Sequence, residues 1–129
     1  MTTQIESSRS SGVLTLTMNG AATKNAIGRD QYETLRAAFV DAGHDPDVRA
    51  IVLTGAGGFS GGNVRALEDS RKLPRSEVAR NTDALFAMIM ALRDCPKPVI
   101  AAVEGGAAGL GLSLALSCDM VVASEGAKF

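Results

Sequence analysis

The chain has 129 residues and a formal net charge of −1, with 46% hydrophobic and 21% charged residues, a composition typical of globular proteins. This length suits one domain with its own core, and the balanced charge argues against a protein that coats nucleic acid or anionic membranes. No apolar run approaches the roughly 20 residues of a membrane helix, and the polar residues 1–8 do not resemble a secretory signal. We therefore expect a single domain, residues 1–129, located in the cytoplasm.

Cysteine and histidine are scarce. Cys95 and Cys118 are too few for a disulfide framework and lie far from any metal-ligand spacing, and His44 is the single histidine. We expect both thiols to be reduced, and we favour small apolar core residues over reactive nucleophiles. No metal site is predicted.

Strands and helices alternate along the first half of the chain. Val13–Met18 alternates apolar residues with Thr, which predicts a half-buried strand. From Arg29, apolar residues recur at spacings of three and four and predict a helix that ends at His44, shortly before Pro46. The apolar positions of that helix are Tyr32, Leu35, Phe39 and Ala42. Val48–Thr54 contains a continuous apolar run and predicts a buried strand.

The second half continues the alternation. The charged residues of Glu68–Arg80 predict a partly ordered surface segment, and Asp83–Arg93 predicts a helix with Leu85, Met88, Ile89 and Leu92 on one face. Val99–Val103 predicts a buried strand, residues 104–118 a glycine-rich turn followed by a helix, and Met120–Ala123 a last strand. Apolar strands alternating with helices indicate an α/β fold with a covered sheet.

Two glycine-rich loops, residues 55–62 and 104–111, each follow a buried strand, the place where such folds bind ligands. Neither contains the sequence of a phosphate-binding P-loop. The order Gly106-x-x-Gly109-x-Gly111 is the reverse of the dinucleotide-binding fingerprint. Residues 58–62 match G-x-S-x-G, but that nucleophile elbow needs a histidine after Ser60, and none follows it.

One remaining function for the loops is to supply two backbone amides, one from each, that hold a developing oxyanion. Such donors depend on backbone shape, which is consistent with the density of glycine. The simpler interpretation is that the glycines only allow tight turns between packed elements.

Several segments in this order and spacing resemble the enoyl-CoA hydratase/isomerase family, also called the crotonase family. They are Leu16–Asn19, Lys24–Ala26, Arg49–Gly55, Phe59–Val64, Lys97–Gly111 and Ala115–Asp119. The resemblance runs from Val13 to Phe129 and implies the α/β ββα spiral of that family, ending about midway through its usual length, before its C-terminal turns and helices. The resulting exposed apolar surface, such as the Leu112–Leu116 helix, predicts tight association with another chain or low stability.

The resemblance implies a substrate and a mechanism. The family's substrate is an acyl-CoA thioester, whose carbonyl is polarised by two backbone amides that then hold an enolate. It implies isomerase- or hydratase-type chemistry in fatty acid metabolism, with no cofactor beyond the coenzyme A of the substrate. It also implies a homo-oligomer, because the family forms trimers or hexamers.

The resemblance also assigns site residues. Counting back from Asp119 places the second oxyanion amide on Leu110, between Gly109 and Gly111. The first amide falls on Gly62 or, on the alternative count, Asn63. We favour Gly62 because that count keeps Val64 apolar and Arg65 basic, as the family pattern has them.

The remaining assigned residues would bind the substrate. Lys24 and Ala26 match the stretch that lines the coenzyme A pocket, although Lys24 is equally consistent with a solvent-facing residue. Gly61, Asn63, Val64 and Arg65 belong to the first loop, and Gly109 and Gly111 to the second. Arg65 has two equally supported interpretations, a contact to coenzyme A phosphates or adenine and a solvated surface charge.

The chain departs from the hydratase pattern at the two catalytic glutamates. Ser113 stands at the first position, and the second position would lie beyond Phe129. A hydroxyl does not replace a carboxylate base at neutral pH, so isomerisation or another enolate chemistry is favoured over hydration. Glu104 and Glu125 are assigned no chemistry. The alternatives are a non-catalytic acyl-CoA-binding protein and a degenerate truncated paralogue.

Overall fold

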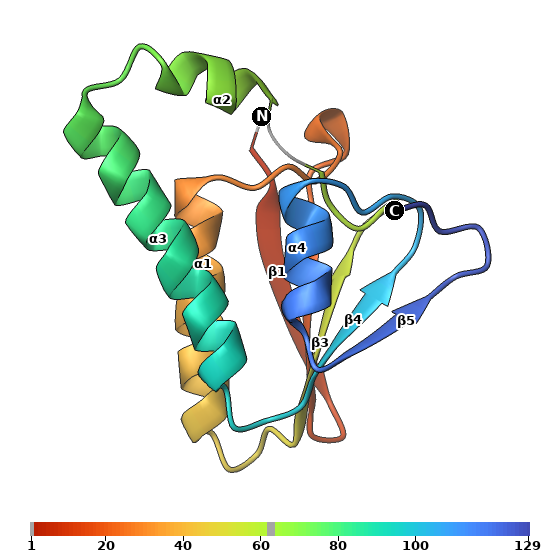
Figure 1. Ribbon diagram of the computed structural model, residues 1–129. Helices are drawn as coiled ribbons and strands as arrows, with labels where there is room; N and C mark the ends of the chain where they lie inside the picture. Colours follow the sequence, from red (N-terminus) through yellow and green to blue (C-terminus); the bar gives the residue numbers. More distant parts are fainter. Residues whose placement is uncertain (1, 62–63) are drawn as a thin grey trace.

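The computed structural model describes residues 2–61 and 64–129 and has a mixed α/β fold around a five-stranded sheet (Figure 1). In chain order the elements are β1 (Gln4–Ser10), β2 (Val13–Asn19), the 3-10 turn η1 (Ala21–Thr23), α1 (Arg29–His44), β3 (Ala50–Gly55), α2 (Val64–Ser70), α3 (Arg75–Asp94), β4 (Val99–Val103), α4 (Leu110–Ser117) and β5 (Met120–Ala123). The strand order in the sheet is β1-β2-β3-β4-β5. β1 is antiparallel to β2, and all other neighbours are parallel.

The helices α1, α3 and α4 cover one face of the sheet. Each parallel strand is added beside the previous one in the same direction, and right-handed crossovers then place these three helices on the same side. Alternate residues of the central strands are accordingly buried and join the core with residues of α1, α3 and α4. The intervening residues, such as Thr15, Val52 and Ile100, are partly exposed. The prediction of a covered sheet is therefore correct for one face only.

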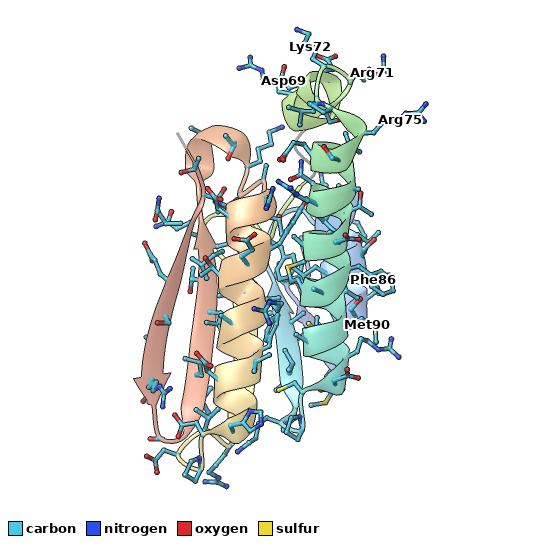
Figure 2. All side chains as sticks on the ribbon, turned by 90° about the vertical axis from the view of Figure 1, so that its left-hand side faces the viewer. Asp69, Arg71, Lys72, Arg75, Phe86 and Met90 are labelled. Carbon is cyan, nitrogen blue, oxygen red and sulfur yellow. The ribbon has the colours of Figure 1, made fainter. Side chains whose placement is uncertain are left out.

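α1 and α3 lie side by side on the covered face (Figures 1 and 2). α1 begins at the predicted residue, where the Gln31 side chain accepts the Gly28 N–H at 2.8 Å, and ends at His44 before Pro46. Its fully buried residues include Leu35 and Phe39. The predicted stripe of this helix is therefore confirmed.

The structure differs from the sequence-based expectation at β1, at residues 68–80 and at the start of β3. β1 was not expected, because its residues are almost all polar and exposed, and it is held by main-chain pairing with β2 rather than by an apolar face. The predicted surface segment 68–80 consists of the end of α2, a turn at residues 71–74 and the first turns of α3, so α3 begins at Arg75 instead of Asp83. These turns were not predicted because they carry charged residues and lack a clear apolar spacing. Glu77, for example, pairs with both Arg29 and Arg80 on the outside of the helices. β3 also begins two residues later than predicted, at Ala50.

Apolar side chains remain exposed on α3, α4 and β5, among other places. Phe86 and Met90 lie on the outer side of α3, 67% and 41% exposed (Figure 2). Leu116 of α4 and Val122 of β5 are 67% and 63% exposed, and every residue of β5 is exposed. The association with another chain that such surface favours stays a prediction. Within the described residues, no helix is long and apolar enough to cross a membrane.

Candidate functional site

The two glycine-rich loops meet at the carboxyl end of the sheet. They follow the adjacent parallel strands β3 and β4, so both leave the same edge. Phe59 and Ser60 donate their N–H groups to the Gly106 carbonyl at 3.1 and 3.3 Å, and Ala108 N–H donates to Ser60 O at 3.2 Å. A short parallel bridge between Ser60 and Ala107 completes the joint. The loops thus form one structure, with the start of α4 beside it.

Two glycines are required by this joint. A Cβ on Gly111 would collide with the backbone carbonyl of Ser60, so the first loop lies directly on the first turn of α4. Gly105 has φ +65°, and a Cβ there would lie 3.1 Å from the Gly58 Cα. The close approach of the two loops therefore depends on the absence of side chains at these positions.

Leu110 presents a backbone amide at the start of α4. It is the first residue of the helix, so its N–H has no acceptor one turn earlier within the helix. Gly109 precedes it with φ 54°, and the next amide, Gly111 N–H, is used by Ala108 O at 3.0 Å. The positive end of the α4 helix dipole lies at this N–H and also favours a negatively charged acceptor. The Leu110 N–H can therefore donate to a ligand oxygen that binds at the amino-terminal end of the helix.

The 3-10 turn before α1 closes against the first loop through Asn25, a residue to which the sequence assigned no function. Asn25 is buried and has φ 56°, a left-handed conformation that Asn adopts more readily than most residues. Its side-chain Nδ2 donates to the carbonyls of Ala56, Gly58 and Phe59 at 3.0, 3.0 and 3.2 Å. In the sequence it lies within Lys24–Ala26, one of the segments that resemble the family, but that resemblance gave it no function.

The predicted coenzyme A residues lie around the same turn. Lys24 is exposed in the left-handed conformation, with its carbonyl 4.0 Å from where a Cβ on Gly61 would be. Ala26 is buried and lines a cavity of about 250 Å³ with Thr23 and Arg29. Lys24, Ala26 and Gly61 are therefore brought to one region.

The structure describes only some of the other residues assigned to the first loop. Arg65 is exposed in the first turn of α2, which begins at Val64. Gly62 and Asn63, the two alternatives for the first amide, lie outside the described residues. The binding functions assigned to all these residues stay predictions.

The structure agrees with the rejection of a serine nucleophile. Ser60 is buried, and its hydroxyl donates to the Asn25 carbonyl at 2.7 Å. His44 is exposed at the far end of the 16-residue helix α1, where its Nδ1 contacts Val40 O at 2.9 Å. Ser60 and His44 therefore do not form a nucleophile and base.

The other polar groups that the sequence singled out, on the described residues, are one serine, two glutamates and two cysteines. Ser113 is exposed on α4, and Glu104 and Glu125 are also exposed. Burial, with a smaller contribution from the Asp119 charge, raises the pKa of Cys118 to about 12, so its thiol is protonated at neutral pH. Both cysteines are free, and the described residues contain no cluster of three or more His, Cys, Asp or Glu suited to a metal ion.

Comparison with known proteins gives one family throughout. The family model for enoyl-CoA hydratase/isomerase matches residues 8–129. The chain is 35% identical over 123 residues to the 1,2-epoxyphenylacetyl-CoA isomerase of Escherichia coli K12, a match that spans 92% of this chain and 46% of that protein.

Solved structures give the same result. An enoyl-CoA hydratase from Polaromonas sp. JS666 superposes with a TM-score of 0.91 at 40% identity, covering 95% of this chain and 49% of the other. An enoyl-CoA hydratase from Mycobacterium avium subsp. paratuberculosis K-10 has a TM-score of 0.81 at 32% identity, covering 95% and 48%.

The chain thus spans about half the length of these relatives. The resemblance found in the sequence is confirmed, as is its implied crotonase fold, over the part that the chain covers. Because the family model and the superpositions extend over nearly all of its residues, this chain belongs to the enoyl-CoA hydratase/isomerase family.

Proposed function

We propose that this chain binds an acyl-CoA thioester and stabilises its enolate with two backbone amides, in an isomerase- or hydratase-type reaction. Family membership supports the substrate class. The observation that carries the proposal is the joint between Ser60 and Ala108, which holds the first glycine loop beside the Leu110 amide at the start of α4. A thioester oxygen located there would accept hydrogen bonds from both loops.

The amides act on the charge that develops in the reaction. When a proton leaves the carbon next to the thioester, the electron pair moves onto the carbonyl oxygen. Leu110 N–H and the amide of Gly62, or of Asn63 on the alternative count, would donate to that oxygen. One such donor lowers a barrier by about 2.7–4 kcal/mol, and the α4 dipole contributes about 0.3–1 kcal/mol more.

The substrate's coenzyme A portion would follow the turn and the loops. Lys24, Ala26, Gly61 and Arg65 are proposed to contact it, together with Asn63, Val64, Gly109 and Gly111. Arg65 is exposed and cationic, which suits the negatively charged phosphates of coenzyme A. A cytoplasmic homo-oligomer acting in fatty acid metabolism, with coenzyme A entering only as part of the substrate, completes the proposal.

A non-catalytic acyl-CoA-binding protein is the second candidate. Ser113 favours it, because a hydroxyl occupies the exposed position on α4 that resembles the site of a hydratase glutamate. The same residue favours isomerisation or another enolate chemistry over hydration within the enzymatic proposal. A turnover assay with crotonyl-CoA and with a β,γ-enoyl-CoA separates binding, hydration and isomerisation.

The direct test is a calorimetric titration of the purified chain with crotonyl-CoA, with free coenzyme A as the control ligand. We expect tighter binding of the thioester. Leu110→Pro removes the N–H at the first helical position, where proline is well tolerated, and Leu110→Ala keeps it. We expect Leu110→Pro to reduce the preference for the thioester about tenfold and Leu110→Ala to keep it. Equal binding of both ligands by the unaltered chain would refute the proposal.

A further inference from the structure

Asn25 uses every polar group it has to join the 3-10 turn to the first glycine loop. Its N–H donates to Gly20 O at 2.9 Å, and its Oδ1 accepts Gly20 N–H at 2.7 Å. Its Nδ2 donates to three carbonyls of the first loop, and its backbone carbonyl accepts a hydrogen bond from the Ser60 hydroxyl. The side chain is 2% exposed, so these bonds are sheltered from competing water.

Ser60 carries the connection from Asn25 to the second loop. Its hydroxyl bonds to Asn25 O at 2.7 Å, while its backbone carbonyl accepts Ala108 N–H at 3.2 Å. The same carbonyl lies against the Cα of Gly111. Ala108 and Gly111 lie on either side of Gly109 and Leu110, so the position of Ser60 limits where the start of α4 can lie.

The chemistry of this position matches asparagine closely. With φ 56° it needs a residue that tolerates the left-handed region, and the three carbonyls need an N–H donor. Aspartate tolerates the backbone but presents only acceptors when ionised. Glycine tolerates the backbone but leaves the three carbonyls without this donor.

We infer that Asn25 is a positioning residue for the oxyanion site: through Ser60 it fixes the register of the two glycine loops and thereby the direction of the Leu110 N–H. The inference rests on the proposed function, because a positioned amide matters only if a thioester oxygen binds to it. Asn25 itself does not touch the substrate in this mechanism.

The test compares the unaltered full chain with Asn25→Gly, Asn25→Asp and Ser60→Ala. Asn25→Gly keeps the left-handed backbone and removes the carboxamide. Asn25→Asp keeps the acceptor for Gly20 N–H and removes the donor. Ser60→Ala removes one hydroxyl and is the mildest change if the others unfold. Ser11→Gly is the matched control, since Ser11 has φ 53° in the exposed turn between β1 and β2.

Three quantities are measured for each variant: the affinity for crotonyl-CoA relative to free coenzyme A, the carbonyl stretching frequency of bound crotonyl-CoA, and amide hydrogen exchange. We expect the Asn25 and Ser60 variants to bind free coenzyme A within about twofold of the unaltered chain but to lose about tenfold in thioester preference. The carbonyl shift should shrink, and the Ala108 amide should exchange about tenfold faster, while the Ile51 amide, bonded to Pro98 O, is unchanged. Ser11→Gly should resemble the unaltered chain.

The outcomes separate the two proposals. Unaltered exchange at Ala108 in all three variants would overturn the connection through Ser60, whatever the ligand data show. Faster exchange with full thioester preference would make Asn25 a structural anchor and overturn its positioning function. If the unaltered chain has no thioester preference while exchange responds as expected, the proposed function fails, and the positioning inference fails with it.

Discussion

Gly111→Ala tests whether the two loops are packed as closely as the structure indicates. The added Cβ would collide with the Ser60 carbonyl oxygen and lie 3.0 Å from the Ser60 Cβ. Ser60 is buried, and its carbonyl also accepts the Ala108 N–H. The added methyl group would therefore strain the contact between the two loops. Overpacking of this kind costs about 1–3 kcal/mol, offset by about 1 kcal/mol from the better helix propensity of alanine.

Because the added Cβ meets a buried backbone oxygen, the cost falls at the upper end of that range, and we expect a net loss of about 2 kcal/mol in the free energy of unfolding. With an m-value of about 2 kcal/mol/M, this lowers the urea midpoint by about 1 M. Gly126→Ala is the control, because a Cβ there meets nothing within 4 Å, and it should change stability by less than about 0.5 kcal/mol. Gly111→Ala should also weaken crotonyl-CoA binding. A variant as stable as the unaltered chain would show that the loops are not in contact at Ser60.

Two predictions concern titratable groups. The hydrogen bond from Arg9, with a smaller one from Asp47 N–H, holds the pKa of Asp45 below its ordinary 3.8, so the pair adds stability above that pH and loses it as the pH falls through the lowered pKa. Urea unfolding should therefore show Asp45→Asn to be less stable than the unaltered chain near pH 7, with the difference shrinking as the pH falls below the ordinary 3.8 of the carboxyl group. A difference that does not change with pH would contradict the pairing. With its pKa raised to about 12, only about one Cys118 thiol in ten thousand is ionised near pH 8. Its reaction with a disulfide reagent should be at least tenfold slower in the native chain than in the unfolded one, and equal rates would contradict its burial.

The central strands and α1 follow from the sequence because their burial is periodic. α1 places Leu35 and Phe39 in the core at helical spacing, and β4 is a short apolar run between a proline pair and glycines. β1 and the start of α3 have no such pattern. β1 is stabilised by main-chain bonds to β2, and the first turns of α3 by exposed ion pairs, neither of which leaves an apolar period.

The candidate site likewise has a part that the sequence predicts and a part that it does not. Its glycine loops could be located because glycine-rich segments follow two buried strands, whereas Leu110 was assigned only through the resemblance to the family and its function stays a prediction. Asn25 was not predictable, since its function depends on three carbonyls found 31 to 34 residues later in the sequence. A single asparagine in a turn looks the same whether its amide is solvated or, as here, buried among carbonyls.

The register of the sheet explains why two loops from separate strands meet so closely. β3 and β4 pair in parallel, with Leu53 opposite Ala101 and Thr54 opposite Ala102. Within the second of these pairs, the Thr54 hydroxyl also donates to Ala102 O at 2.9 Å. Each loop therefore starts from a fixed level. Beyond the strands, an isolated parallel bridge between Ser60 and Ala107 joins the loops again, with one more residue between Thr54 and Ser60 than between Ala102 and Ala107. Because a slip of one residue would turn buried side chains to the other face, the hydrophobic core that fixes the register also fixes the level at which the loops meet. The alignment of the Leu110 amide with the first loop is thus a consequence of core packing, which Asn25 and Ser60 refine locally.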